Sequence, residues 1–400
     1  MFSSYRGDRR EHCYSARRTN RRVFTVRLAL VALTALLAFG ARAAPQQIAI
    51  FDRSHWPETL DTAVLFDVAS RAEILSFARV LSETEALDDA TLTARLQLRQ
   101  ANLPMVREVR ERLWRTLWRN YDLAQQSCEQ DASFCYAVEN LGDLRRTAAT
   151  FAVAADSFYA GWAEPSRQFH IAYLNELLRK AALFPQTASE VAFFSPQEVT
   201  GDRLNDRLFL LSFDGGPSIV PGTTEALTTF LRKQKLEGLF FVLGQNLQTR
   251  RDKQSMQALR ELYRGQCVGT QGWQYRSHAQ WQDWQDSVMR GVARAQSDLP
   301  EQYVPLFRPP YGQRRADSPA FFASQNLRVT LWDIDAQDLG PLTAEQSAQR
   351  TLTLMLLWRR GLIQLHDSQA KAQDVVTWLL SNTAQSGIGW EGCKDFAEGR

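Results

Sequence analysis

The chain has 400 residues, 44% of them hydrophobic and 23% charged, a composition that excludes an intrinsically disordered protein and allows about two domains. The formal net charge is +3, but residues 1–43 hold nine Arg against one Asp and one Glu, a net charge of +7. The remaining chain is therefore near −4. This balance excludes the basic surface of a nucleic-acid-binding protein, so we expect no nucleic-acid partner.

Residues 1–43 have the pattern of a signal peptide. The arginines precede an apolar run, Leu28–Phe39, and Ala41 and Ala43 have the small-residue spacing of a cleavage site. The run is shorter than the roughly 20 residues that a membrane-spanning helix needs. We therefore predict an exported protein, periplasmic or secreted, that is not an integral membrane protein after cleavage. An uncleaved amphipathic anchor is the alternative.

Residues 44–195 are predicted to form an α-helical N-terminal domain. One apolar stripe at three- and four-residue spacing follows Pro104, a residue tolerated in the first turn of a helix: Val106, Val109, Leu113, Leu117 and Tyr121. A second stripe ends before Pro185: Phe169, Tyr173 and Leu177. His55 and His170 have no companion at metal-ligand spacing, so we expect both to be structural.

From residue 196 to residue 400, short apolar runs alternate with helical stretches. The runs are 208–213, 239–243, 266–268, 329–332 and 362–365. This alternation predicts parallel strands joined by crossover helices, hence an α/β sheet or barrel. The functional site of such a fold lies at the carboxyl ends of its strands.

Four cysteines remain once Cys13 is removed with the signal peptide: Cys128, Cys135, Cys267 and Cys393. An even number in an exported chain favours disulfides, and three pairings are possible. We favour a bond between Cys128 and Cys135, which closes a short loop. The spacing is not that of a paired CxxC zinc site, and buried free thiols are the alternative reading.

Polar side chains follow the predicted strands and should converge in space. They are Asp214, His278, Arg308, Asp333, Asp335, Asp338, His366 and Asp367. Two histidines, several carboxylates and an arginine at strand ends are typical of general acid–base catalysis.

Five stretches in this region resemble, in order, the motifs of the polysaccharide deacetylases of carbohydrate esterase family four, the group with the NodB-homology domain. The stretches are SFDGGP (212–217), GLFFVLGQN (238–246), RPPYG (308–312), LWDIDAQDL (331–339) and LIQLHD (362–367). The resemblance extends from about residue 202 to about residue 390. It implies a deformed (β/α) barrel of the polysaccharide deacetylase type over residues 196–400, preceded by the α-helical domain.

The resemblance also implies a role for each matched residue. Asp214 falls on the general base that activates a water molecule, and Arg308 on the residue that holds that carboxylate. His366 falls on the general acid that protonates the leaving amine, and Asp338 on the carboxylate that tunes the imidazole. Two further positions match groups that contact the acetyl unit: the backbone amide of Tyr311, at the oxyanion, and Leu365, beside the methyl group.

The metal site of this family is incomplete in the sequence. The family holds a divalent, zinc-like ion with one Asp and two His, the latter in a pattern like NHTYSHP. Gly215 stands at the Asp position, and we place the His pattern on residues 273–279, so that Gln274 replaces the first His and His278 retains the second. One of the three protein ligands that a catalytic zinc normally takes would remain. We expect weak or atypical metal dependence and no organic cofactor.

The sequence therefore predicts an exported hydrolase that removes acetyl groups from an acetylated amino-sugar glycan by cleaving the amide C–N bond. Retention of the four proton-handling residues favours this function. A catalytically inactive glycan-binding protein of the cell envelope is the alternative, with Trp273, Trp281 and Trp284 as sugar-stacking platforms or as core residues. A third possibility is a structural partner that acts through the helical domain.

Overall fold

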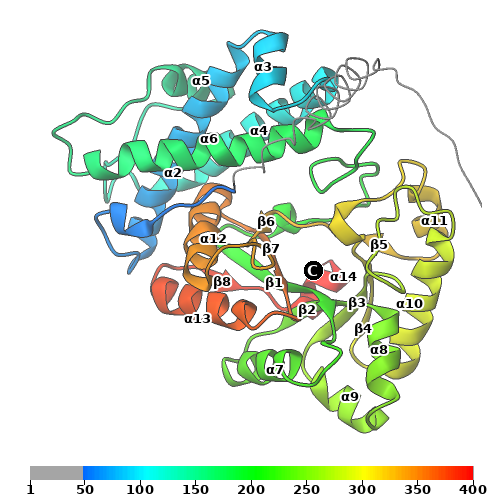
Figure 1. Ribbon diagram of the computed structural model, residues 1–400. Helices are drawn as coiled ribbons and strands as arrows, with labels where there is room; N and C mark the ends of the chain where they lie inside the picture. The colour runs from blue at the N-terminus through cyan, green and yellow to red at the C-terminus, as the bar shows by residue number, and fades with distance from the viewer. Residues whose placement is uncertain (1–47, 400) are drawn as a thin grey trace, which may run out of the picture. The chain divides into compact units, whose positions relative to one another are not determined.

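A computed structural model describes residues 48–399, which Figure 1 shows as a group of helices beside a parallel sheet that is flanked by further helices. The predicted signal peptide, residues 1–43, lies outside the described residues. Within residues 48–399, the structure has no helix both long and apolar enough to cross a bilayer. Export itself stays a prediction.

The region from residue 53 to residue 182 is helical, as predicted. Its elements are η1 (Arg53–His55), α2 (Ala63–Glu85), α3 (Asp89–Arg95), α4 (Leu103–Ala124), η2 (Gln125–Ser127), α5 (Leu141–Thr150) and α6 (Ala160–Ala182). Helix α4 begins after Asn102, whose side chain accepts a hydrogen bond from Met105 N, and Pro104 lies in its first turn. The predicted apolar stripe of α4 is buried, which explains why this segment packs as a helix.

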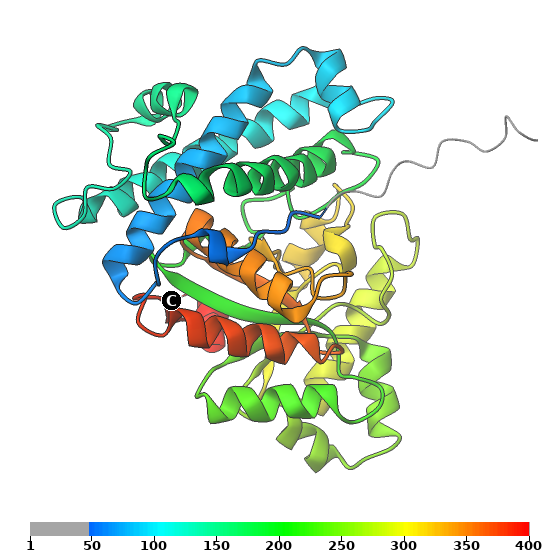
Figure 2. The ribbon, with the colours of Figure 1, turned by 60° about the vertical axis from the view of Figure 1, so that its left-hand side comes forward.

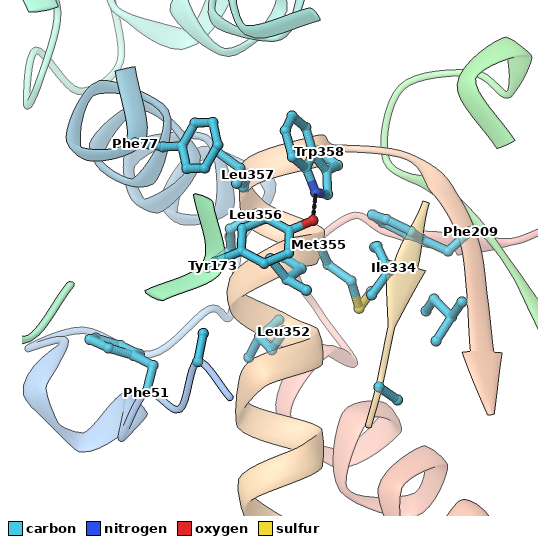
Figure 3. Close-up of a cluster of buried hydrophobic side chains, with 14 of the residues drawn as sticks. Phe51, Phe77, Tyr173, Phe209, Ile334, Leu352, Met355, Leu356, Leu357 and Trp358 are labelled. Atoms are coloured by element: carbon cyan, nitrogen blue, oxygen red, sulfur yellow. Dashed lines mark hydrogen bonds between the residues drawn. The ribbon is translucent and has the colours of Figure 1, made fainter. Parts of the chain in front are cut away.

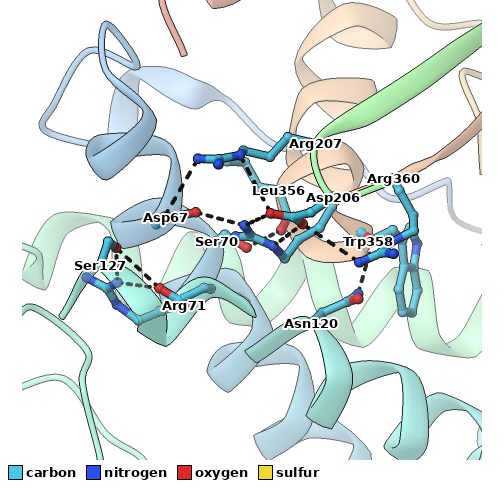
Figure 4. Close-up of polar contacts among 12 residues, drawn as sticks. Asp67, Ser70, Arg71, Asn120, Ser127, Asp206, Arg207, Leu356, Trp358 and Arg360 are labelled. Carbon is cyan, nitrogen blue, oxygen red and sulfur yellow. Dashed lines mark hydrogen bonds and ion pairs between the residues drawn. The ribbon is translucent and has the colours of Figure 1, made fainter. Parts of the chain in front are cut away.

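Helix α12 (Ala344–Trp358) connects these helices to the sheet, and Figure 2 shows it between them and α13 (Lys371–Thr383). Figure 3 shows its apolar cluster, in which Trp358 Nε1 donates to the Tyr173 hydroxyl of α6 at 3.0 Å. Figure 4 shows polar contacts nearby, where Ser70 Oγ of α2 donates to the carbonyl of Leu356 at 2.7 Å. The helices and the sheet thus share a core, and the division at residues 195 and 196 stays a prediction.

Eight parallel strands form one sheet in the order β5-β4-β3-β2-β1-β7-β6, with β8 paired to β1. They are β1 (Leu208–Gly216), β2 (Gly238–Val242), β3 (Cys267–Thr270), β4 (Tyr303–Phe307), β5 (Arg328–Val329), β6 (Ile334–Asp335), β7 (Gly361–His366) and β8 (Gly389–Trp390). Four predicted apolar runs correspond to β1, β2, β3 and β7. Of the run 329–332, only its first residue lies in a strand, β5.

The sheet curls into an incomplete barrel. Its edge strands β5 and β6 are consecutive in the chain, and only residues 330–333 separate them. The remaining helices are η3 (Gly201–Arg203), α7 (Thr223–Lys233), α8 (Gly244–Arg251), α9 (Met256–Leu262), α10 (Trp284–Asp298), η4 (Pro310–Gly312), α11 (Pro319–Ser324) and α14 (Cys393–Glu398). The deformed (β/α) barrel behind a helical region is thereby confirmed.

Strand alternation decides which side chains face the interior of the barrel. Three side chains of β1 pack in the helix-facing core: Phe209, Leu211 and Phe213. Leu210 packs instead with Leu362 of β7 in the interior core. Because side chains two residues apart share a face, Asp214 and His366 point to the interior as Leu210 and Leu362 do.

Candidate active site

A buried ion pair lies at the end of β1. Asp214 is 1% exposed, and Arg308, which follows β4, is fully buried. Arg308 Nη1 donates to Asp214 Oδ1 at 2.9 Å and to Ser212 Oγ at 2.9 Å, while two backbone carbonyls accept from its other nitrogens. Asp214 Oδ2 accepts from Gln364 Nε2 at 2.7 Å. Two donors therefore fix the orientation of this carboxylate.

A carboxylate–imidazole pair lies on the neighbouring strand. His366 ends β7 and is the register partner of Asp214 on β1. Its Nδ1 is 2.8 Å from Asp338 Oδ1, and its backbone N–H donates to Asp338 Oδ2 at 2.8 Å. Burial lowers the pKa of His366, but the hydrogen bond and charge of Asp338, with the charges of Asp214 and Asp335, raise it by more. The structure thus brings together all four predicted proton-handling residues.

Leu365 does not join them. Its side chain is fully buried in the helix-facing core, on the face of β7 opposite to that of His366. The prediction that Leu365 contacts the acetyl methyl group is therefore corrected. The β7 residue that faces Asp214 is Gln364, which the sequence analysis missed and which the two-residue alternation of a strand could have identified.

Tyr311 adopts a left-handed backbone conformation, with φ of 60°, in the loop that follows Arg308. Its half-exposed ring lies edge-on against Tyr275, with 4.7 Å between the ring centroids. The oxyanion role of the Tyr311 backbone amide stays a prediction.

Gly215 is held by Gln271 rather than by Gln274. The backbone N–H of Gly215 donates to Gln271 Oε1 at 2.9 Å, and its carbonyl accepts from Asn246 Nδ2 at 2.9 Å. Gln271 directly follows β3 and is fully buried. Gln274, the expected first His position, lies three residues beyond Gln271, which is the residue that the structure brings to Gly215.

His278 has the environment of a core histidine. It is 1% exposed, its ring lies edge-on against Phe307 at 5.5 Å, and its Nε2 is 3.3 Å from Ser287 Oγ of α10. Burial lowers its pKa to about 4, so the imidazole is neutral at physiological pH. Its role as a retained metal ligand stays a prediction that these contacts do not favour.

Asp335 and Asp367, also named from the sequence, lie near His366. Asp335 orders the turn after β6, because it accepts from the Gln337 backbone N–H at 2.8 Å. Asp367 is buried, and burial raises its pKa to about 7. A Cβ atom at Gly216 would lie 2.0 Å from Asp367 Oδ2. The second glycine of SFDGGP is therefore needed to make room for this carboxylate.

Residues 201–330 match the family model described as polysaccharide deacetylase. The chain carries a polysaccharide deacetylase domain. Peptidoglycan-N-acetylmuramic acid deacetylase PdaC of Bacillus subtilis (strain 168) is 28% identical over 225 residues, which are 54% of this chain and 44% of PdaC. Chitin deacetylase 1 of Saccharomyces cerevisiae (strain ATCC 204508 / S288c) is 28% identical over 180 residues, 41% of this chain and 53% of the enzyme.

The chain spans about half the length of these two curated relatives. Solved structures similar to it include a pseudoenzyme of carbohydrate esterase family four from Bacillus anthracis. That chain is 14% identical, and the match covers 48% of this chain and 66% of that one with a TM-score of 0.40.

The residues of this deacetylase domain do not fit the zinc-like ion that the family implies. Gly215 has no side chain, and the Gln271 oxygen already accepts from Gly215 N. Within residues 48–399, the one group of three His, Cys, Asp or Glu close enough to share an ion is Glu237, Cys267 and Cys393, whose two sulfurs form a disulfide. A catalytic zinc takes about three nitrogen, sulfur or carboxylate ligands from protein, and neither Gly215 nor Gln271 supplies one.

Asp333 belongs to the fourth motif of the deacetylase domain but lies at the start of β7. Its Oδ2 accepts from the backbone N–H groups of Gly201 and Leu362 at 2.7 and 2.8 Å. Burial raises its pKa to about 6 in spite of these bonds. The folded state therefore holds this proton at pH values where the unfolded chain has lost it, and stability falls as the pH rises from about 4 to about 6.

We expect Asp333→Asn to remove this pH dependence. The stability of wild type relative to the variant should fall by about 2 kcal/mol between pH 4 and pH 7, because a shift of one pKa unit corresponds to about 1.36 kcal/mol and the unfolded carboxylate is already partly ionised at pH 4. Urea unfolding of both proteins across this range measures the difference. A difference that is constant with pH would show that Asp333 titrates alike in the folded and unfolded states.

Proposed function

We propose that this domain hydrolyses the C–N bond of an acetamido group on an acetylated amino-sugar glycan and releases acetate. One observation carries the proposal: Asp214, paired with Arg308, and His366, paired with Asp338, lie in register at the ends of the neighbouring strands β1 and β7. A base and an acid at one edge of a sheet are the groups that amide hydrolysis needs. The names of the two relatives, deacetylases of peptidoglycan N-acetylmuramic acid and of chitin, support an acetylated glycan as substrate.

In the proposed reaction, Asp214 accepts a proton from water while the water oxygen attacks the acetyl carbonyl carbon. Arg308 and Gln364 hold the carboxylate in place. His366, whose pKa Asp338 raises against the effect of burial, gives its proton to the amide nitrogen as the C–N bond breaks. The products are acetate and a glycan with a free amine.

We also propose that the protein acts in the periplasm or outside the cell. Two disulfides support this location, Cys128–Cys135, the pairing favoured from the sequence, and Cys267–Cys393. Disulfides persist in oxidising compartments and are rare in the cytosol. The predicted signal peptide at residues 1–43 supports the same conclusion.

Acetate release from chitin oligomers and from acetylated peptidoglycan tests the proposal. We expect the wild-type protein to release acetate and Asp214→Asn to release it about 100- to 10,000-fold more slowly, which is the usual contribution of a general base. Asn keeps the size of the side chain and an oxygen that can accept from Arg308, and circular dichroism checks that the variant is folded in spite of the lost charge. Release by Asp214→Asn at the wild-type rate, or no release by wild type from any acetylated glycan, would contradict the proposal.

A second candidate is a glycan-binding protein without catalysis. The observation that favours it is the position of the metal ligands, where Gly215 and Gln271 stand. Of the tryptophans proposed as platforms, Trp284 is buried against Phe321 at 4.8 Å, whereas Trp273 remains partly exposed. Binding of chitin oligomers in calorimetry without acetate release would favour this candidate over the hydrolase.

A further inference from the structure

Gln271 and Tyr275 are separated by the same number of residues as the two metal-binding histidines of the family, and neither side chain carries a charge. In the pattern NHTYSHP the histidines are four residues apart, and Gln271 and Tyr275 have this spacing in the stretch TQGWQYR, residues 270–276. The structure favours this alignment over the one on residues 273–279, because Gln271 contacts Gly215, which stands at the position of the family's metal-binding Asp.

The orientation of the Gln271 amide follows from its partner. The backbone N–H of Gly215 can only donate, so the amide oxygen must face it, at 2.9 Å. The Nε2 group of Gln271 therefore points away from Gly215 N. Gln271 is fully buried, and Nε2 has no hydrogen-bond partner among the described residues. A buried amide without an acceptor is costly, so an acceptor supplied by a ligand would satisfy it.

Tyr275 closes the neighbouring position. The ordinary pKa of a tyrosine hydroxyl is about 10, so the Tyr275 side chain is neutral at physiological pH. A neutral phenol is a poor ligand for a hard or borderline cation, for which anionic oxygens, imidazole and thiolate are the usual donors.

We propose, on the basis of the proposed deacetylase function, that this site works without a divalent cation and that Gln271 Nε2 donates a hydrogen bond to the acetyl oxygen of the bound glycan. The Gln271 amide then stabilises the charge that develops on this oxygen when water attacks. It takes the part that the cation has in the family. One such donor is worth about 100- to 1,000-fold in rate.

Metal content and glycan affinity test the proposal independently of turnover. We expect elemental analysis of the full-length wild-type protein to find less than stoichiometric zinc, manganese, nickel and cobalt, and chelation with EDTA to leave acetate release unchanged. One bound cation per chain, with acetate release lost on its removal, would overturn the proposal. The triple variant Gly215→Asp/Gln271→His/Tyr275→His should gain one zinc ion per chain, which calorimetry with zinc alone measures.

Gln271→Glu tests the donor directly, since the glutamate keeps an oxygen for Gly215 N and loses the N–H donor. We expect acetate release to fall about 100-fold or more, and the affinity for chitin oligomers to fall too, because a carboxylate would repel the acetyl oxygen. Gln280→Glu is the matched control, since Gln280 lies exposed in the same loop. Unchanged release and affinity in Gln271→Glu would overturn the donor role.

These measurements also separate the inference from the proposed function. A wild-type protein that binds chitin oligomers without releasing acetate would contradict the hydrolase. The affinity of Gln271→Glu would then still decide whether Gln271 contacts the acetyl group. A variant that unfolds is recognised by its melting temperature, and Gln271→Asn, which keeps the amide but shortens its reach, then serves as the second test: affinity equal to that of wild type would overturn the contact.

Discussion

Replacing Arg308 with methionine is expected to lower the free energy of unfolding by about 3–5 kcal/mol, because the buried Asp214 carboxylate would lose its cation. Arg308 also donates to Ser212 and to two backbone carbonyls, which would be left without these donors. Methionine fills a similar space without charge, so the lost stability reflects the lost polar contacts more than a change in side-chain volume. Urea unfolding at pH 7 measures the effect.

The same substitution at an exposed ion pair is the control. Arg264 Nε lies 2.9 Å from Glu261, but the two side chains are 68% and 57% exposed. Surface pairs contribute about 0–1 kcal/mol, so Arg264→Met should change stability little. The double variant Asp214→Leu/Arg308→Met removes both charges and should be more stable than Arg308→Met alone. Equal losses at Arg308 and Arg264 would contradict the buried-pair interpretation.

The convergence of Asp214, Arg308 and His366 could be predicted because two signals in the sequence agree. Asp214, Arg308 and His366 follow apolar runs or family motifs, and a parallel sheet places the carboxyl ends of its strands at one edge. The register of β1 and β7 then brings Asp214 beside His366. The chemistry of the residue and its position in the fold point to the same site.

Two site positions were misplaced because the pattern of apolar residues does not show where a strand ends or which face a side chain is on. Gln271 and Gln274 both have a partner four residues later, and the choice between them depends on where the short strand β3 ends. Leu365 and Gln364 differ by one residue, which in a strand means opposite faces. The strands β6 and β8 have two residues each and depend on pairing with β7 and β1 rather than on their own sequence.

One of the two disulfides could be predicted from the sequence, and the other could not. The bond between Cys128 and Cys135 spans 7 residues and follows from loop length, whereas the bond between Cys267 and Cys393 spans 126 residues and depends on the fold. The second pairing arises because α14 packs in the interior core beside β3, where both sulfurs are buried. The alternative of buried free thiols is therefore wrong.

Removing the Cys267–Cys393 bond by a double alanine substitution is expected to lower the free energy of unfolding by about 5 kcal/mol, because the bond restrains a long loop in the unfolded chain. The same model gives about 2.5 kcal/mol for the Cys128–Cys135 bond, which closes a short loop. Urea unfolding of the two double variants without reductant measures both losses.

The two double variants form a matched pair, since each removes one bond and two sulfur atoms. Cys267 and Cys393 are buried in the interior core, and Cys128 and Cys135 are partly exposed, so cavity formation should widen the difference between the losses. Equal losses would mean that packing of α14, rather than the bond, restrains the end of the chain. Mild reductant should open Cys128–Cys135 first, because the buried sulfurs become accessible only when α14 detaches from β3.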